Sequence, residues 1–329
     1  MPFNKKYFEI AQERLAVRRM HNKQIQEERS TEIYSKIPQY SDLECQLSST
    51  MARIIASIAE HKENSQVLVK QAIEDNNVIQ RKMTQLLIDG GYPADYLDPI
   101  YTCHICKDKG TDGEKWCECF KKILYKVAAE QINAASPLKL CDFNTFRFDL
   151  YSDKPDADMK RTQRQIMQDN FNECFSYAEN FNGKGKSIFM IGNTGLGKTH
   201  LSLAIANRVI QRGFCVVYGS VPELLRKLDN EQFGKAEGDT MGLLVECDLL
   251  ILDDLGAENS TDRAVSLLYE IINARQNRNA PLIVNTNLDM SGIQKRYQDR
   301  LWSRLFSMRV LLFCGTDNRI KLSQLRKDD

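Results

Sequence analysis

Gly192-Asn-Thr-Gly-Leu-Gly-Lys-Thr199 is the stretch that decides the fold, because it matches the pattern G-x-x-x-x-G-K-[ST]. It follows a strand-like apolar run, Ser187–Ile191, and opens a helical stretch that continues to Arg212. A strand, a glycine-rich loop and a helix in this order form a phosphate-binding loop, in which backbone N–H groups and the helix N-terminus face the anion. The motif predicts an ATP site in which Lys198 reaches the β- and γ-phosphates and Thr199 binds Mg²⁺.

A second motif supplies the acidic groups that a Mg²⁺–nucleotide site requires. In Leu249-Leu-Ile-Leu-Asp-Asp254, four apolar residues predict a buried strand with Asp253 at its carboxyl end, where the carboxylate would hold Mg²⁺. The next acid, Asp254, is placed to orient or deprotonate the attacking water, or alternatively to cap the following loop. The expected ligands of ATP and Mg²⁺ are Gly192, Asn193, Thr194, Gly195, Leu196, Gly197, Lys198, Thr199 and Asp253, with Thr199 and Asp253 on the metal.

Apolar runs alternate with helical stretches from about residue 138 onward. That alternation predicts an α/β fold, a parallel sheet with helices on both faces. The fourth run ends in amides, and we expect Asn287, at the strand end, rather than Asn285, to position the water or sense the γ-phosphate. The five expected strands are Ser187–Gly192, Cys215–Gly219, Leu249–Asp253, Pro281–Asn287 and Arg309–Cys314.

The C-terminal segment, residues 295–327, is locally basic. Within it, Arg300 and Arg304 lie one helical turn apart. One of them is expected to point outward as an arginine finger that contacts the γ-phosphate bound by a neighbouring subunit. The alternative is an ordinary solvated helix face.

Four cysteines gather in residues 95–125. Cys103, Cys106, Cys117 and Cys119 have the spacing C-x2-C-x10-C-x-C, with a turn-rich connector between the two pairs. Zinc prefers four soft ligands in a tetrahedron, so the spacing predicts a structural zinc site; His104 could replace a cysteine, and redox or buried cysteines are the alternative. The scattered cysteines are expected to be small core residues: Cys45, Cys141, Cys174, Cys215, Cys247 and Cys314.

The first ninety residues favour helices. Ser41 and Glu44 are spaced as a capping box that opens one helix, and Gly90-Gly91 with Pro93 ends a later one. The apolar faces of these helices either pack on one another in a small bundle or dock a partner, and the two interpretations are compatible.

Length and composition restrict the remaining possibilities. The 329 residues favour two domains, and a net charge of +1 excludes bulk electrostatics as a basis for binding nucleic acid or membrane surfaces. Because the chain has no stretch of about 18 apolar residues and no signal peptide, we expect a cytoplasmic protein with no membrane association.

Several stretches resemble the DnaC/DnaI replicative helicase loaders and the related IstB transposition helpers, which belong to the AAA+ class. They cover roughly residues 138–329, and the cysteine cluster is similar to that of the DnaI branch, whose N-terminal zinc-bearing domain binds the helicase. The stretches are Glu246-Cys-Asp-Leu-Leu-Ile-Leu-Asp-Asp-Leu-Gly256, Val221-Pro-Glu-Leu-Leu225, Val284-Asn-Thr-Asn-Leu288 and Asp299-Arg-Leu-Trp-Ser-Arg-Leu305.

The resemblance implies roles for individual residues. It makes Arg304 the finger and Arg319 a sensor of the bound nucleotide, and it implies an AAA+ domain without a C-terminal helical lid. Most AAA+ proteins have Glu at the position of Asp254, so the shorter Asp predicts slow hydrolysis. Single-stranded DNA would stimulate this hydrolysis by binding the inner face of a head-to-tail oligomer, with Tyr218, Arg226 and Lys227 as candidate contacts.

The expected organisation has four parts. Residues 1–94 would bind a hexameric replicative helicase, and residues 95–125 would bind zinc. Residues 126–137 would form a linker to the ATPase domain, residues 138–329. The function implied is an ATP-dependent loader that helps deposit the helicase on single-stranded DNA. The alternatives are an IstB-like transposition helper and a nucleotide-switched adaptor with negligible turnover.

Overall fold

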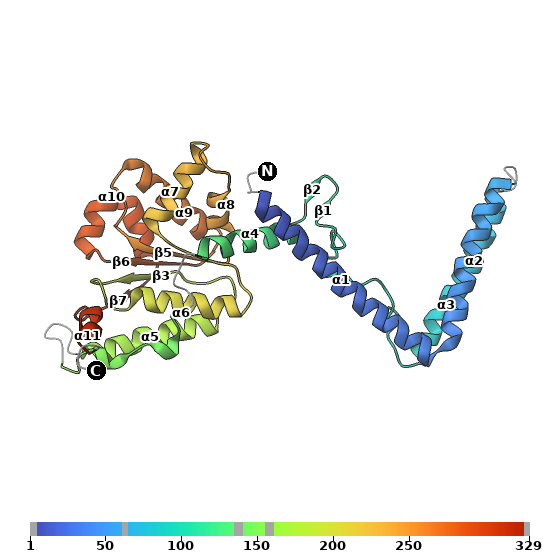
Figure 1. The fold of residues 1–329 in the computed structure, drawn as a ribbon, viewed down its shortest axis with the longest axis horizontal. Helices are drawn as coiled ribbons and strands as arrows, with labels where there is room; N and C mark the ends of the chain where they lie inside the picture. Colours follow the sequence, from blue (N-terminus) through green and yellow to red (C-terminus); the bar gives the residue numbers. More distant parts are fainter. Residues whose placement is uncertain (1–4, 61–64, 135–140, 155–160, 326–329) are drawn as a thin grey trace. The chain divides into compact units, whose positions relative to one another are not determined.

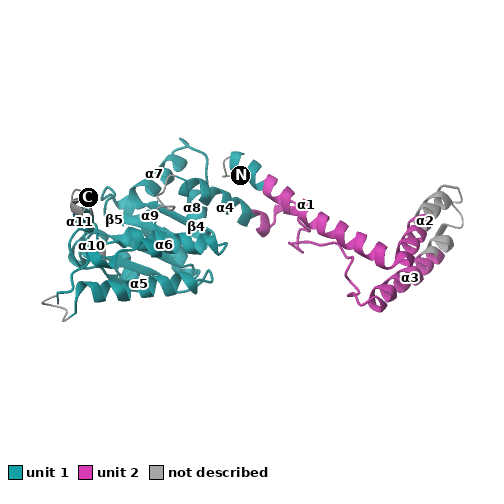
Figure 2. Ribbon diagram, turned by 60° about the horizontal axis from the view of Figure 1, so that its bottom comes forward, with its two compact units in different colours: residues 1–11, 121–329 teal, residues 12–120 magenta. Residues whose placement is uncertain are grey.

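The computed structural model describes residues 5–60, 65–134, 141–154 and 161–325. The chain divides into two compact units, one comprising residues 12–120 and the other residues 1–11 and 121–329 (Figure 2). The boundary predicted between residues 137 and 138 lies outside the described residues. Much of the expected linker, up to Asn133, belongs to helix α4 (Glu118–Asn133).

The unit of residues 12–120 is mainly helical, as the sequence predicts. It contains most of α1 (Lys5–Lys36), followed by α2 (Pro38–Glu60) and α3 (Ser65–Asp89). Apolar side chains from all three helices meet in a small core, so the helices support one another. The buried members of this core are Ile33, Tyr40, Met83 and Leu87.

The start of α2 differs from the prediction. The helix begins at Pro38, so Ser41 lies inside it, and the prediction that Ser41 and Glu44 open a helix is wrong. Proline favours the first helical position because its fixed φ suits a helix and its missing N–H would have no partner there. Glu44 instead accepts a hydrogen bond from the Tyr34 hydroxyl at 2.5 Å.

A short antiparallel hairpin joins the two cysteine pairs. It consists of β1 (Thr111–Asp112) and β2 (Lys115–Trp116), with Thr111 opposite Trp116. The second pair then lies at the start of α4.

The second unit is built on a five-stranded sheet in the order β4-β5-β6-β3-β7 (Figure 1). Every pairing in it is parallel, which confirms the predicted fold class. Because parallel strands end at one edge, the loops after β3, β5 and β6 open side by side. The strands are β3 (Ile188–Ile191), β4 (Val216–Ser220), β5 (Leu249–Leu255), β6 (Leu282–Thr286) and β7 (Arg309–Leu312).

Helices cover both faces of this sheet (Figure 1). Successive strand residues alternate between two cores; in β3, Phe189 joins one core and Met190 the other. The first core is closed by α7 (Val221–Gln232), α8 (Thr240–Glu246), α9 (Asp262–Asn277) and α10 (Met290–Phe306). The second is closed by α5 (Gln163–Glu179) and α6 (Lys198–Gln211), and α11 (Asn318–Leu325) follows β7.

A buried carboxylate ties the loop after β5 to α10. Glu258 is 6% exposed and accepts hydrogen bonds from the Tyr297 hydroxyl at 2.5 Å and from Arg296 Nε at 3.3 Å. It also accepts from the backbone N–H of Gly256 at 2.8 Å, which fixes the start of the loop. This loop begins just after Leu255, the last residue of β5, so α10 and the carboxyl end of β5 are joined by a buried polar network.

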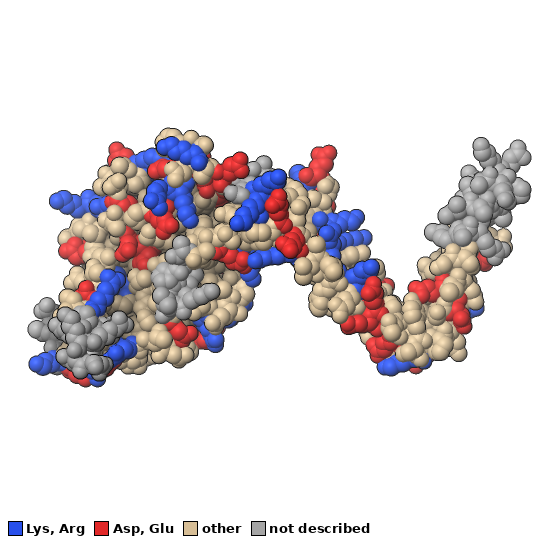
Figure 3. Space-filling view, in the orientation of Figure 1, with Lys and Arg blue, Asp and Glu red and all other residues tan. Residues whose placement is uncertain are grey.

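The surface carries charges of both signs. On the face shown in Figure 3, Lys and Arg side chains are interspersed with Asp and Glu, in keeping with the net charge of +1. Within the described residues, every helix is too short or too polar to cross a lipid bilayer.

Candidate nucleotide site and cysteine cluster

The loop between β3 and α6 has the backbone shape of a phosphate cradle. Gly192 has φ +155°, and a Cβ there would lie 2.4 Å from the carbonyl oxygen of Phe313. Gly197 precedes α6 with φ +92°, a left-handed conformation that favours glycine. The glycines therefore let the chain turn tightly, and the N–H groups of the first turn of α6 remain available to an anion.

Lys198 is the first residue of α6, and its side chain reaches back into this loop. Its ammonium group donates to the carbonyl oxygens of Gly192 at 2.6 Å and Asn193 at 2.8 Å, and to Asn287 Oδ1 at 2.7 Å. Burial lowers the pKa of Lys198 to about 8, an effect that the negative charges of Asp253 and Asp254 partly offset. All three acceptors are neutral oxygens, so phosphate oxygens would be stronger partners for this cation.

Asp253 lies at the carboxyl end of β5, as predicted, and is 3% exposed. Its Oδ1 accepts a hydrogen bond from the hydroxyl of Thr199 at 3.3 Å. A hydroxyl and a carboxylate side by side are hard oxygen ligands of the kind that Mg²⁺ takes in phosphate sites. The two residues predicted to hold Mg²⁺ are thus brought together.

Asp254 and Asn287 meet across the same site. Asp254 has a left-handed φ of +55°, and its Oδ1 accepts from Asn287 Nδ2 at 3.2 Å. Burial and the adjacent charge of Asp253 raise the pKa of Asp254. Asn287 therefore bridges Lys198 and Asp254, whereas Asn285 is buried and donates to Ser202 and Asp253.

A cavity of about 660 Å³ opens over these groups, a size suited to a small-molecule ligand. The predicted residues Arg319, Asn287 and Asp254 line it beside the loop. The rest of the wall was not predicted from the sequence. It comes from the region of two short helices, η2 (Phe143–Thr145) and η3 (Phe148–Leu150), from α6, β4 and α11, and from the loop after β5. The additional lining residues are Thr145, Phe146, Arg147, Leu150, Tyr151, His200, Tyr218, Ala257 and Asn318.

The aromatic part of this wall is anchored directly to the loop. The Tyr151 hydroxyl donates to the carbonyl of Leu196 at 2.9 Å, and the Phe146 ring stacks on the Tyr151 ring with centroids 5.8 Å apart. The signal in the sequence is the dense run of aromatics at positions 143, 146, 148 and 151 ahead of the glycine-rich loop. An apolar wall next to a phosphate cradle suits a flat base.

Arg304 is placed apart from this cavity. It lines a separate shallow depression together with Tyr269, Asp299, Arg300, Ser303 and Ser307. Its guanidinium donates to Gln276 Oε1 at 3.3 Å and lies 5.9 Å from the Tyr269 ring centre. Arg300, one turn earlier, is exposed.

The three candidate DNA contacts lie in different environments. Tyr218 is 9% exposed and its hydroxyl donates to Asp253 Oδ2 at 2.6 Å, so the expectation that it contacts DNA is wrong. Arg226 is exposed on α7, and Lys227 lines a small cavity next to Asp239 and Thr240.

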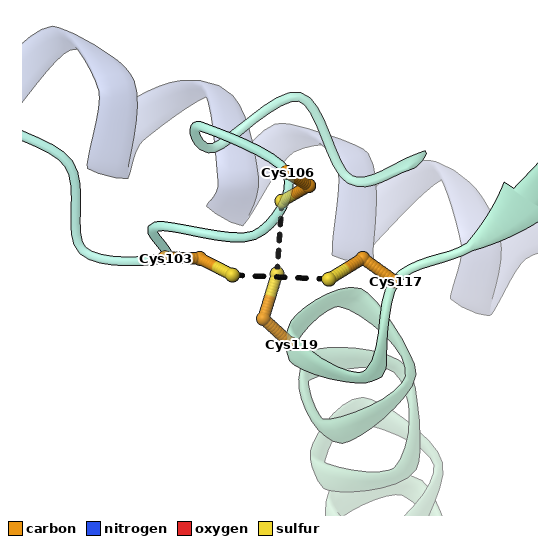
Figure 4. Close-up of side chains that lie close together, drawn as sticks. All are labelled: Cys103, Cys106, Cys117 and Cys119. Atoms are coloured by element: carbon orange, nitrogen blue, oxygen red, sulfur yellow. Dashed lines mark hydrogen bonds between the residues drawn. The ribbon is translucent and has the colours of Figure 1, made fainter. Parts of the chain in front are cut away.

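The four predicted cysteines converge, and all their Sγ atoms lie within 4.8 Å of one another (Figure 4). The distance from Cys103 Sγ to Cys117 Sγ is 3.7 Å, and that from Cys106 Sγ to Cys119 Sγ is 3.4 Å. A backbone N–H of Cys106 that points at Cys103 lowers the pKa of this thiol to about 7. Such a cluster could hold a metal ion; among the described residues the group consists of cysteines only, and His104 is exposed.

The surroundings of the cluster were not foreseen from the sequence. Asp108 is 1% exposed, and it accepts from Arg18 Nη2 at 2.5 Å and from the backbone N–H of Cys103 at 3.0 Å. Arg18, on α1, also lies 3.5 Å from Cys119 Sγ. A positive charge beside four thiols would offset part of the negative charge that metal binding creates.

The remaining cysteines are only partly as expected. Cys174 and Cys247 are buried. Cys45, however, is exposed on α2, so its assignment to a core is wrong, and Cys141, Cys215 and Cys314 are intermediate.

Several known proteins resemble parts of this chain. The family of IstB-like ATP binding proteins matches residues 156–315. The replicative helicase loader DnaC of Escherichia coli (strain K12) is 27% identical over 131 residues, which is 39% of this chain and 54% of DnaC. The phage-like element PBSX protein XkdC of Bacillus subtilis (strain 168) is 27% identical over 260 residues, 73% of this chain and 91% of XkdC.

Among solved structures, the crystal structure of the DnaC helicase loader aligns with 55% of this chain and 100% of its own, with a TM-score of 0.46 and 20% identity. The match to the curated DnaC sequence spans about half of that protein's length, 54%.

An all-parallel sheet, with the glycine-rich loop directly after β3 and the paired acids near the carboxyl end of β5, defines a P-loop nucleotide-binding domain. More specifically, residues 156–315 are similar to the IstB-like ATP binding proteins, and other similar sequences are the DnaC and DnaI helicase loaders and an insertion sequence ATP-binding protein.

Proposed function

We propose that this protein is an ATP-dependent loader of a hexameric replicative DNA helicase, which it helps to deposit on single-stranded DNA. The observation that carries the proposal is the 131-residue match to the helicase loader DnaC. A separate helical unit with a cysteine cluster, residues 12–120, supports it further, because it offers a second surface through which a partner could be held.

In this proposal the site hydrolyses ATP with Mg²⁺. Thr199 and Asp253 would hold Mg²⁺, and the bound ion would neutralise charge on the β- and γ-phosphates. Lys198 would donate its hydrogen bonds to phosphate oxygens in place of the carbonyl oxygens of Gly192 and Asn193. Asp254 would orient the attacking water, and Asn287, which bridges Lys198 and Asp254, would register the arrival of the γ-phosphate between them.

Two arginines would act on the nucleotide from different molecules. Arg319 lines the cavity of its own chain and would sense the bound nucleotide there. Arg304 lines a separate depression and would reach the γ-phosphate of a neighbouring copy stacked head to tail. ATP would then hold copies together around single-stranded DNA, and hydrolysis, slow and stimulated by that DNA, would loosen them.

The cysteine cluster would bind zinc. A tetrahedron with zinc–sulfur distances of about 2.3 Å has sulfur–sulfur edges of about 3.8 Å, close to the 3.7 Å between Cys103 and Cys117. Four thiolates leave no open coordination position, so the metal would be structural.

Removal of zinc is expected to disrupt the cluster and spare ATP binding. Purified protein should contain about one zinc per chain, and a chelator should remove it and expose four additional reactive thiols, because the small cluster has little apolar core of its own. Metal analysis with thiol titration checks this. Cys103→Ser should lose the metal, whereas Cys45→Ser, at an exposed position on α2, should keep it; zinc far below one equivalent in the parent protein would refute the assignment.

Helicase binding is the decisive test of the proposed function. We expect the full chain to form a complex with its host's hexameric replicative helicase, detected by size-exclusion chromatography with light scattering. Cys103→Ser should weaken this complex and retain ATP affinity, because the proposed partner surface and the nucleotide site belong to different units. Lys198→Ala should lose ATP affinity and retain the complex with the helicase.

A second candidate function is suggested by the IstB-like family match. In that case the protein would present DNA to a transposase. Absence of a helicase complex, together with ATP-dependent binding to a transposase, would favour this function over helicase loading.

A further inference from the structure

The carboxylate of Asp253 is held by donors on both of its oxygens. Oδ1 accepts from Thr199 Oγ1 at 3.3 Å, from Asn285 Nδ2 at 2.9 Å and from the backbone N–H of Asp254 at 3.1 Å. Oδ2 accepts from the Tyr218 hydroxyl at 2.6 Å. With three donors Oδ1 is crowded, whereas Oδ2 has one donor and keeps a lone pair for a further ligand.

Tyr218 is built into the sheet at the point where it can reach this oxygen. It lies on β4 directly opposite Ile251 of β5, and its backbone N–H donates to Asn133 Oδ1 at 2.9 Å. The side chain is 9% exposed, packs in the core that α5 and α6 close, and still lines the nucleotide cavity. A phenol hydroxyl is protonated at neutral pH, so it can act as the donor to Asp253 Oδ2.

We propose that Tyr218 is a positioning residue for the catalytic metal, which sets the rotamer of Asp253 and leaves Oδ2 directed at Mg²⁺ or one of its waters. The proposal rests on the Mg²⁺–ATP site proposed above. Asn285 anchors one carboxylate oxygen and Tyr218 the other, so the plane of the carboxylate is fixed at two points before any metal arrives. Pre-organisation of this kind lowers the cost of binding, because the carboxylate need not be ordered by the metal.

The role differs from general support of the core. The Tyr218 ring would remain in a Tyr218→Phe variant and keep its apolar contacts, and only the contact to Asp253 Oδ2 would be lost. Loss of an outer-shell partner of a metal ligand typically costs about 10–100-fold in metal affinity. We expect a loss of that size for the metal and none for the nucleotide alone, because the phosphates are held by the loop and Lys198.

The experiment measures Mn²⁺ binding by electron paramagnetic resonance, with a non-hydrolysable ATP analogue present, in the full chain and in Tyr218→Phe. Nucleotide affinity in EDTA is measured in parallel, and thermal unfolding verifies the fold. Tyr177→Phe is the matched control: Tyr177 is partly buried, and its buried hydroxyl has no hydrogen-bond partner within the described residues.

We expect the Mn²⁺ dissociation constant of Tyr218→Phe to rise at least about tenfold. The Mn²⁺ dissociation constant of Tyr177→Phe, and the nucleotide affinity of both variants in EDTA, should equal those of the parent protein. In an Asp253→Asn background, Tyr218→Phe should have no further effect, since it acts through that carboxylate. An unchanged or tighter Mn²⁺ affinity in Tyr218→Phe, or an equal loss in Tyr177→Phe, overturns the proposal. A parent protein that binds no Mn²⁺ with the analogue instead refutes the Mg²⁺ site itself.

Discussion

Arg304→Ala is expected to reduce assembly-dependent ATP hydrolysis by roughly 10³-fold or more, without changing the ATP affinity of the isolated monomer. Charge accumulates on the γ-phosphate oxygens as the bond breaks, and a planar guanidinium stabilises it well. Arg304 lies outside the cavity of its own chain, in a separate depression. If it serves the reaction, it does so in a neighbouring copy.

The guanidinium is prepared for such a role. Gln276 Oε1 accepts from it at 3.3 Å, Gln276 Nε2 donates to the Arg304 carbonyl at 3.0 Å, and the Tyr269 ring lies 5.9 Å away. These partners are neutral, and an incoming phosphate would be a stronger partner for the guanidinium than the Gln276 amide oxygen.

A mixing experiment separates action in trans from action in cis. Arg304→Ala and Lys198→Ala should each be inactive alone, yet mixtures should regain part of the hydrolysis, because an intact arginine can meet an intact loop across a junction. Arg300→Ala, at the exposed neighbour one turn away, is the matched control and should retain activity. No recovery at any ratio, with both variants shown to co-assemble, would exclude Arg304 as a finger in trans.

Asp254→Asn is expected to retain ATP binding and to reduce hydrolysis by about 10²–10⁴-fold, the usual contribution of a general base. Asn tolerates the left-handed backbone of this position as well as Asp does, so the variant removes charge without adding strain. Burial and the electrostatic repulsion from Asp253 raise the pKa of Asp254, which makes its carboxylate more basic, as proton abstraction requires.

Equilibrium binding of a fluorescent ATP analogue and single-turnover hydrolysis together check this prediction. Asp254→Glu restores the carboxylate one methylene further out and should hydrolyse ATP at or above the parent rate. Hydrolysis by Asp254→Asn at the parent rate would mean that Asp254 caps the following loop and takes no part in the reaction.

The sheet and the core of the nucleotide site could be predicted because short, continuous stretches of the sequence are enough to identify them. Apolar runs of strand length give β3, β5 and β6, and parallel strands bring their carboxyl ends together. Lys198, Asp253 and Asn287 therefore had to meet once the fold was known. The cysteine cluster was equally accessible, since thiols at such short spacing have few other arrangements.

The parts that were missed depend on contacts between distant segments. Tyr218 lies 35 positions before Asp253, and nothing in its neighbourhood indicates that its ring turns toward the nucleotide rather than outward. Arg18 reaches Asp108 across 90 positions, a pairing that no spacing rule anticipates. At Ser41 a local rule was misleading, because Pro38 provides an earlier and equally favourable helix start.

The buried link between Glu258 and α10 has a consequence for genetics. The carboxylate that joins the loop after Asp254 to Tyr297 and Arg296 touches neither the glycine-rich loop nor Arg304 within the described contacts. A random screen for loss of function should nevertheless recover substitutions at Glu258, Arg296 and Tyr297. Suppressors of such alleles would be found on either side of the link, so the pattern of second-site revertants would map this connection without any knowledge of the structure.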